Sequence, residues 1–359
     1  MKNIAFFISE HGFGHASRAT SIINKLLRYK KIHIIIFSNI PKWFFDKSII
    51  GNFDLFNFPT DVGLVQDNPF KEDLDKTLEN LEQFYFFQDQ RLGIFCEKIR
   101  AVNVELIICD ISPIGMLVAK KLGVRSVLIE NFTWDWIYEP YLSSYSEFGK
   151  YIEIIKNLNS LADFHFQTTP ICNRNEKYLL FPPIFREKRH SKEDTRRGLG
   201  VPLSAKLVLV TMGGIPISVN QITFNFDDKN TYFVIPGSDV KTQISNKNKI
   251  FLPHDHNFFH PDLVHASDIV IGKVGYSTIA EVYSAQVPFL YIPRENFRES
   301  IYLEKFIQTE LIGVPIKLES LMDGTIKEDL QKVLDSPKKV IMVKNGADMI
   351  SILITENLL

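Results

Sequence analysis

A glycine-rich loop follows the first apolar run of the chain. Between Ser9 and Arg18 the sequence reads SEHGFGHASR. Gly12 and Gly14 permit backbone conformations that are closed to other residues and let a ligand approach the main chain. His15 follows where an apolar-periodic segment begins, and imidazole suits proton transfer near neutral pH. Because the third glycine of a dinucleotide fingerprint is missing, the loop predicts a general-base histidine in place of a phosphate site; packing of His15 at a helix start is the alternative.

An aspartate follows a later apolar run, in the sequence LIICDISPIGMLVAKKLG. Asp110 precedes Ser112 and Pro113, so it is a candidate N-cap for the next helix. The functional alternative is that it accepts the proton on the second ring nitrogen of His15 and stabilises the imidazolium that forms during catalysis. Both residues follow predicted strands of one sheet, which makes His15 and Asp110 a candidate catalytic pair.

The second half of the chain carries an anion-binding pattern, SDIVIGKVGYSTIAEVYSAQVPFLYIPR. An apolar strand at Ile269–Ile271 leads into a turn and then a helix, whose first N–H groups and dipole favour a diphosphate. Glu281 lies about a turn further on, where a carboxylate can accept hydrogen bonds from a ribose. The alternative is a close-packed glycine turn with a solvated glutamate. The candidate phosphate residues are Lys273, Gly275, Tyr276, Ser277 and Thr278, with Gly213 and Gly214 as a second flexible loop.

Short apolar runs alternate with helix-like segments throughout, which predicts an α/β fold with doubly wound parallel sheets. We expect an N-terminal Rossmann-like domain at 1–185, a linker at 186–205 and a second Rossmann-like domain at 206–345. A final helix at 346–359 is expected to fold back on the first domain. The predicted strands are Ile4–Ile8, His33–Phe37, Glu105–Cys109, Ser126–Ile129, Phe164–Thr168, Leu207–Val210, Tyr232–Ile235, Ile250–Leu252, Ile269–Ile271, Phe289–Ile292 and Val314–Ile316.

Charge and cysteine content exclude several classes of protein. The 359 residues include 41 basic and 42 acidic side chains, so we expect no nucleic-acid partner. Cys96, Cys109 and Cys172 are odd in number and widely spaced, which argues against a disulfide framework and favours a reducing compartment. The first apolar run is too short to span a membrane. We therefore expect a cytoplasmic protein.

Two further patterns have a structural and a functional interpretation. A histidine-rich segment is interrupted by prolines, and Asp73–Asp75 lies in a charged helix-like run, so we expect no metal site. Aromatic segments either fill the core or line an acceptor pocket and touch the inner face of a membrane. The histidines are His254, His256, His260 and His265, and the aromatic segments are Lys42–Phe45, Phe84–Phe87 and Trp134–Trp136.

The segment Gly275–Glu281, followed by the apolar Val287–Pro293, resembles the donor signature of inverting GT-B glycosyltransferases, in particular the MurG-like branch and the plant UDP-glucosyltransferases. The resemblance covers both halves of the chain. It implies two Rossmann-like domains facing each other across a cleft, metal-independent hexosyl transfer from a nucleotide-diphosphate sugar, with UDP as the expected nucleotide, and no separate cofactor. It places the diphosphate on Gly275, Ser277 and Thr278, the ribose on Glu281, and donor sugar hydroxyls on Glu299.

The same resemblance assigns activation of the acceptor to His15 and its orientation to Asp110. The string GFGHASR is similar to a subgroup of uncharacterised MurG-like proteins and to the amino-terminal part of L-arabinokinases. Lys273-Val274 and Arg298-Glu299-Ser300 depart from the plant pattern, and these departures leave the donor sugar and its nucleotide open. The acceptor, a sugar, a lipid or another small molecule, is open too.

Two rival functions are compatible with these motifs. A nucleotide-sugar hydrolase of the kind that acts in pseudaminic acid synthesis carries a similar G-x-G-H-x-x-R loop, which Arg18 completes here. A catalytically silent sugar-nucleotide-binding protein would keep the donor signature, but the presence of both His15 and Asp110 argues against it.

Overall fold

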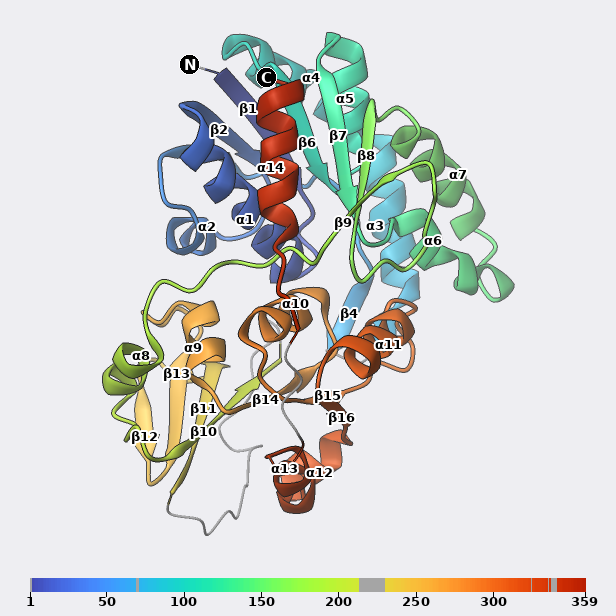
Figure 1. The fold of residues 1–359 in the computed structure, drawn as a ribbon. Helices are drawn as coiled ribbons and strands as arrows, with labels where there is room; N and C mark the ends of the chain where they lie inside the picture. The colour runs from blue at the N-terminus through green and yellow to red at the C-terminus, as the bar shows by residue number, and fades with distance from the viewer. Residues whose placement is uncertain (1, 69–70, 213–229, 324, 335, 337–340) are drawn as a thin grey trace. The chain divides into compact units, whose positions relative to one another are not determined.

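The computed structural model describes residues 2–68, 71–212, 230–323, 325–334, 336 and 341–359, and Figure 1 draws their fold. The chain divides into two compact units. The first unit comprises residues 1–185, 296–299 and 345–359, and the second comprises 186–295 and 300–344. Each unit is an α/β domain built on a mainly parallel sheet, which confirms the predicted fold class.

The sheet of the first unit is parallel throughout its described strands, in the order β3-β2-β1-β6-β7-β8-β9. Its strands are β1 (Lys2–Ile8), β2 (Ile32–Phe37), β3 (Phe53–Phe56), β6 (Leu106–Asp110), β7 (Arg125–Glu130), β8 (Phe164–Thr168) and β9 (Leu179–Phe181). A hairpin of β4 (Val65–Asn68) and β5 (Lys71–Asp73) lies outside this sheet. The helices are α1 (Phe13–Tyr29), α2 (Lys42–Ser48), α3 (Leu74–Phe86), α4 (Gln88–Ala101), α5 (Ile114–Leu122), α6 (Trp134–Tyr138) with the 3-10 turn Glu139–Ser143, α7 (Phe148–Asn159) and α14 (Gly346–Asn357).

The apolar strands of this unit are buried on both faces. In β1, Ile4, Phe6 and Ile8 join the core beneath α1 and α14. Ala5 and Phe7 point the other way, into the core that includes α4 and α5. Because alternate side chains of a strand face opposite sides of the sheet, a strand covered on both sides must be apolar at every position.

The last helix of the chain belongs to the first unit. In Figure 1, α14 runs alongside α1, and the Ser351 hydroxyl donates to the carbonyl of Ile22 at 3.3 Å. Lys25 pairs with Asp348 at 2.5 Å. The apolar face of α14 completes the core on this side of the sheet.

The second unit has the strand order β12-β13-β11-β10-β14-β15-β16 among its described residues. All pairs are parallel except β12 with β13. Its strands are β10 (Lys206–Thr211), β11 (Thr231–Ser238), β12 (Ile244–Asn246), β13 (Lys249–Pro253), β14 (Ile269–Lys273), β15 (Phe289–Ile292) and β16 (Gly313–Pro315). Its helices are α8 (Lys192–Leu199), α9 (His260–Ala266), α10 (Tyr276–Ala285), α11 (Ser300–Glu310), α12 (Leu318–Asp323) and α13 (Lys327–Leu334).

Strand register brings the loops that carry the candidate catalytic residues together. Ile8 at the end of β1 is paired with Asp110 at the end of β6, and Asp110 is paired with Ile129 of β7. The loops after these three strands therefore leave the sheet side by side at its carboxyl edge, where open α/β sheets bind ligands.

Candidate functional site

The glycine-rich loop after β1 turns directly into α1. Gly12 is the residue before the helix and has φ 74° and ψ 177°, a left-handed region that favours glycine. A Cβ at Gly12 would meet nothing within 4 Å, so the glycine leaves open space beside the helix start. Phe13 and Gly14 begin α1, and His15 is its third residue, with only 7% of its surface exposed.

The structure brings His15 and Asp110 together. The His15 Nδ1 and the Asp110 Oδ1 are 2.8 Å apart. Arg18 holds both oxygens of the same carboxylate, with Nε 2.7 Å from Oδ2 and Nη2 2.6 Å from Oδ1. The N-cap alternative for Asp110 is wrong, because α5 starts after Pro113 without a side-chain cap and the aspartate is engaged by His15 and Arg18.

Asp110 is held as a carboxylate. Burial alone would raise its pKa, but the charge and hydrogen bonds of Arg18, together with the bond to His15, outweigh burial and lower the pKa below its ordinary value. Asp110 and Arg18 are 2% and 1% exposed, so the ion pair is inaccessible to water. The next residue, Ile111, has φ 48°, a strained value for a β-branched side chain and one that is typical of functional sites.

Arg18 extends the site to two further side chains. Its Nη1 donates to the Asn131 Oδ1 at 2.7 Å, and the Asn131 Nδ2 donates to the Glu299 Oε1 at 2.7 Å. Glu299, the predicted sugar-binding residue, thus lies in the first unit on a chain of bonds that leads to His15. Asn131 directly follows the apolar strand β7, but no motif in the sequence indicates its role; Arg18 is indicated only by the hydrolase-like loop.

Aromatic rings surround this network. The imidazole of His15 lies edge-on to Phe132, with ring centres 5.9 Å apart, and 6.5 Å from the ring of Trp134. His11 lies edge-on to Trp134 at 5.0 Å and stacks with Phe297 at 6.1 Å. Phe132, Trp134 and Phe297 are each no more than 3% exposed, so these rings form a buried wall of the site.

Segment 296–299 is anchored beside these rings. Arg298 stacks on the Trp136 ring, with its guanidinium carbon 4.0 Å from the ring centre, and its Nη1 donates to Glu139 at 2.8 Å. Trp136 is buried, whereas Phe86 and Phe87 are 78% and 44% exposed. The predicted aromatic segments therefore divide into core residues and surface residues.

The predicted diphosphate residues lie where β14 leads into α10 in the second unit. Lys273 ends β14, Gly275 precedes the helix without a side-chain cap, and a Cβ at Gly275 would meet nothing within 4 Å. Tyr276, Ser277 and Thr278 form the first turn of α10. An uncapped helix start with open space and hydroxyl groups is suited to bind an anion.

Glu281 lies on α10, where Arg186 and His260 both bind its carboxylate. Arg186 donates to its Oε1 from Nη2 at 2.8 Å, and its Oε2 lies 2.6 Å from the His260 Nδ1. Burial would raise the pKa of Glu281, but Arg186 and His260 outweigh burial and lower it to about 2. The carboxylate is thus charged and fixed in position. Its oxygens keep lone pairs that can accept further hydrogen bonds, so ribose binding by Glu281 stays a prediction. Gly213 and Gly214 lie outside the described residues.

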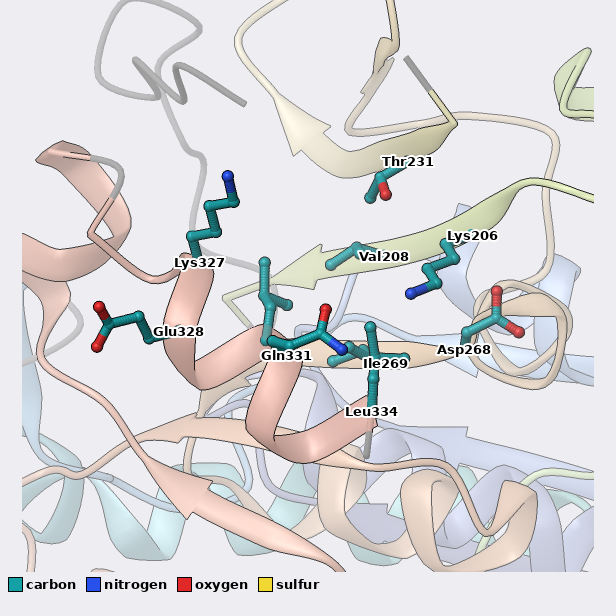
Figure 2. A pocket seen from close by; sticks show the side chains of 10 residues that line it. Lys206, Val208, Thr231, Asp268, Ile269, Lys327, Glu328, Gln331 and Leu334 are labelled. Atoms are coloured by element: carbon teal, nitrogen blue, oxygen red, sulfur yellow. The ribbon is translucent and has the colours of Figure 1, made fainter. Parts of the chain in front are cut away.

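A separate cavity opens at the other edge of the second sheet. Figure 2 shows it between α13 and the starts of β10, β11 and β14, and it has a volume of about 430 Å³. Lys206, Thr231 and Ile269 line it from these strand starts, whereas Lys273 stands at the end of β14. The cavity is therefore distinct from the predicted anion site.

The described residues offer neither a cluster of metal ligands nor a membrane-spanning helix. No three His, Cys, Asp or Glu side chains gather as possible metal ligands within the described ranges. Among the described helices, none is both long enough and apolar enough to span a bilayer.

Comparisons with known proteins define the class. Two solved structures match nearly the whole chain: a UDP-glucosyltransferase from Polygonum tinctorium (TM-score 0.64, 11% identity, 99% of this chain and 98% of the other) and MurG of Acinetobacter baumannii (TM-score 0.55, 12% identity, 99% and 100%). The architecture is that of GT-B glycosyltransferases. Residues 2–334 match the profile of glycosyl transferase family 1, and the chain belongs to this family of glycosyltransferases.

Two curated relatives are more similar in sequence but cover less of the chain. The L-arabinokinase of Arabidopsis thaliana is 24% identical over 327 residues, which cover 89% of this chain but 31% of the plant protein, so the chain spans about a third of that relative's length. An uncharacterised glycosyltransferase of Methanopyrus kandleri is 21% identical over 263 residues, covering 70% of this chain and 75% of the relative. The expected resemblance to MurG and the UDP-glycosyltransferases is confirmed.

Proposed function

We propose that the protein transfers a sugar, with inversion, from a nucleotide-diphosphate sugar to an acceptor hydroxyl, with His15 as the general base. The observation that supports this most is the bond between the His15 Nδ1 and Asp110 at 2.8 Å. A proton on Nδ1 leaves the lone pair on Nε2, and none of the described residues hydrogen-bonds that atom. The Asp110 carboxylate, which can only accept a hydrogen bond, favours the proton on Nδ1 and would stabilise the imidazolium that proton uptake creates.

In the proposed step, the acceptor oxygen gives its proton to the His15 Nε2 and bonds to the anomeric carbon of the donor sugar. The bond between that carbon and the diphosphate oxygen breaks on the opposite face, and the diphosphate leaves with the electron pair. Lys273 and the start of α10 would stabilise the growing negative charge without a metal ion. We assign ribose binding to Glu281 and contact with a donor sugar hydroxyl to Glu299.

UDP is the nucleotide we favour. Two solved structures with the same fold are described as complexes with UDP and with UDP-2fluoro-glucose, TcCGT1 and Phytolacca americana UGT2. Their sequence identities to this chain are 11% and 12%, so the choice of UDP is a proposal. A panel of nucleotides and nucleotide sugars in a thermal-shift assay tests it, because a ligand of the native state raises the melting temperature.

The His15→Ala variant tests the central assignment. We expect it to lose turnover while its thermal shift with the preferred nucleotide sugar stays unchanged. His33→Ala is the matched control, because His33 is also paired with an aspartate, Asp54 at 3.0 Å, but lies at the start of strand β2, away from the strand ends that carry the candidate site. A fully active His15→Ala variant would contradict the proposal.

Water as acceptor is the second candidate, favoured by the position of Arg18 in the network beside His15. Free sugar formed from the donor without added acceptor, at a rate that acceptors do not increase, would identify a hydrolase. Ligand binding with no turnover under any condition would identify a silent binding protein.

The proposal includes a cytoplasmic location with peripheral contact at the inner membrane face. The exposed Phe86 and Phe87 are the candidate contact, because aromatic rings favour the bilayer interface. Sedimentation with anionic vesicles tests it against a Phe86→Ser, Phe87→Ser double variant; equal pelleting of both proteins would contradict it.

A further inference from the structure

A buried carboxyl with one unpartnered oxygen lies in the loop after β3. Asp61 is 2% exposed, and its Oδ2 accepts a hydrogen bond from the Trp134 Nε1 at 2.7 Å. Within the described structure, its Oδ1 has no hydrogen-bond partner. Buried polar atoms almost always have partners, and each exception is costly. The missing partner of Oδ1 therefore needs an explanation.

The loop that carries Asp61 is fixed at the carboxyl edge of the first sheet. The Thr60 hydroxyl donates to the carbonyl of Ile8 at 3.0 Å, and the Ser112 hydroxyl donates to the carbonyl of Thr60 at 2.9 Å. The Tyr138 hydroxyl donates to the carbonyl of Val62 at 2.6 Å. Asp61 thus stands beside the ends of β1 and β6, which lead to His15 and Asp110.

One indole ring links Asp61 to the candidate base. Trp134 bonds Asp61 through Nε1, while its ring centre is 6.5 Å from that of His15. The ring of His11 lies against the same indole at 5.0 Å. His15 and Asp61 are therefore both in contact range of Trp134, within one group of side chains.

The environment of Asp61 suits a hydrogen bond with a hydroxyl group. Burial raises its pKa to about 7; the nearby Ser9 side chain and the Trp134 N–H oppose this rise, and the charges of Glu10 and Asp110 add to it. Near neutral pH the carboxyl thus exists in both forms and can donate or accept. The hydrogen bond from Trp134 requires only an acceptor. The amide oxygen of an asparagine would supply one without the cost of burying an ionisable carboxyl.

We propose that Asp61 is an acceptor-binding residue whose Oδ1 hydrogen-bonds a second hydroxyl of a carbohydrate-like acceptor, next to the hydroxyl activated by His15. This inference rests on the proposed function. A carboxyl beside aromatic rings is the chemistry that recognises a polyhydroxylated ring, whereas an acceptor with a single hydroxyl would leave Oδ1 unpaired. Sites built to pair a hydroxyl discriminate strongly against analogues that lack it.

The test uses Asp61→Asn, which keeps the shape and an acceptor for Trp134. The control is Asp54→Asn in the neighbouring strand β3, where the side chain is 55% exposed. A panel of methyl glycosides and their monodeoxy analogues is measured for binding in the presence of UDP and as acceptors with the donor. We expect Asp61→Asn to raise the KM and Kd for the best glycoside about tenfold, leaving the KM of the donor unchanged.

The deoxy analogues identify the contact. Removing the hydroxyl that contacts Asp61 from the glycoside should weaken its binding to the wild type by a similar factor. The Asp61→Asn variant should bind this deoxy glycoside almost as well as the parent glycoside. Equal losses in both proteins, or an unchanged KM for the acceptor in Asp61→Asn, would overturn the inference. If the variant does not fold, the monodeoxy series with the wild type is decisive. Wild-type binding that does not change when any hydroxyl next to the attacked one is removed would overturn the inference.

Failure of the proposed function gives a different result. Glycoside binding that depends on Asp61, but with no sugar transfer by the wild type, would contradict transferase activity and leave the acceptor site standing. Sugar transfer that proceeds equally well in Asp61→Asn and in the wild type would support transferase activity and contradict acceptor binding by Asp61. No binding of any glycoside to the wild type would overturn the carbohydrate class of acceptor.

Discussion

His15 and Arg18, three positions apart on α1, bind the same oxygen of one aspartate. The His15 Nδ1 is 2.8 Å and the Arg18 Nη2 is 2.6 Å from the Asp110 Oδ1. Residues at this spacing lie on one face of a helix, so a single turn of α1 supplies both the candidate base and the cation that balances its partner. The carboxylate therefore has one position and one charge state before any substrate arrives.

Removing the Arg18 charge should damage both stability and activity. Arg18→Met leaves the Asp110 carboxylate buried without its cation, which typically costs roughly 3–5 kcal/mol. We expect a matching fall in the free energy of unfolding by urea and a lower kcat, with the KM of the donor unchanged. Arg18→Lys restores the charge without the two-pronged geometry and should recover part of kcat. Arg197→Met, on an exposed side chain, is the control.

If Arg18 serves only for packing, the methionine and lysine variants will lose kcat to the same extent. Rescue by lysine is therefore the readout that separates a charge effect from loss of shape.

Asp110→Asn should change the tautomer of His15 without breaking the contact. An amide N–H facing Nδ1 would favour the proton on Nε2, the nitrogen that is proposed to take the proton of the acceptor hydroxyl. A comparable change in a serine protease lowers kcat about 10⁴-fold, and we expect a loss of about 10³-fold or more here, with nucleotide binding unaffected. Nucleotide titration and steady-state kinetics measure the two effects, and a loss below tenfold would contradict a base that depends on this tautomer.

Much of the fold could be predicted from sequence because it depends on local pattern. Apolar runs of four to six residues are typical of strands buried on both faces, and the glycine loop before His15 predicted the helix start. The charged run at 186–205, predicted to be a linker, contains α8, which begins after a Ser191 cap and is followed by Gly200 with φ 74° as its C-cap. Ser191 and Gly200 are typical helix caps and indicate this helix, whereas the dense charge of the run favours a linker.

Partners that are distant in the chain could not be predicted. Asn131 meets Arg18 across 113 positions, and Glu281 meets Arg186 across 95. Nothing in the spacing of such residues indicates that they touch, because tertiary packing of the strands and loops brings them together. Sequence motifs therefore identified Asp110 and Glu281 as candidates, but not the cations that set their charge.

The pKa of Asp61 predicts a stability that falls as the pH rises. The folded protein holds a proton up to about pH 7, whereas the unfolded carboxyl releases it near 3.8. Between these values the folded state binds more protons, so stability declines with pH and reaches a loss of about 4 kcal/mol above pH 7. Asp61→Asn should therefore be more stable than the wild type at pH 8 and gain little at pH 4.

Urea unfolding at pH 4, 6 and 8 measures this difference. A gain in stability that is the same at all three values would contradict the shifted pKa. A variant that is more stable but binds acceptor less well would show that Asp61 is retained at the expense of stability.

Glu281 predicts the opposite dependence. Its pKa in the folded protein is about 2, below the ordinary 4.5, so its pairing with Arg186 and His260 stabilises the fold above pH 4.5. This contribution, about 3 kcal/mol, is lost as the pH falls toward 2. Glu281→Gln should thus be less stable than the wild type at pH 7, with the two unfolding free energies converging toward pH 3.

The same variant separates structure from donor binding. Gln keeps an oxygen that can accept a hydrogen bond from the ribose in the proposed contact. UDP affinity, measured at a temperature where both proteins are folded, should therefore fall only several-fold, although folding stability falls clearly. The exposed Glu193→Gln on α8 is the control and should shift neither curve. If the stability difference between Glu281→Gln and the wild type stayed constant from pH 7 to pH 3, the negative charge of Glu281 would not be the source of the stabilisation by Arg186 and His260.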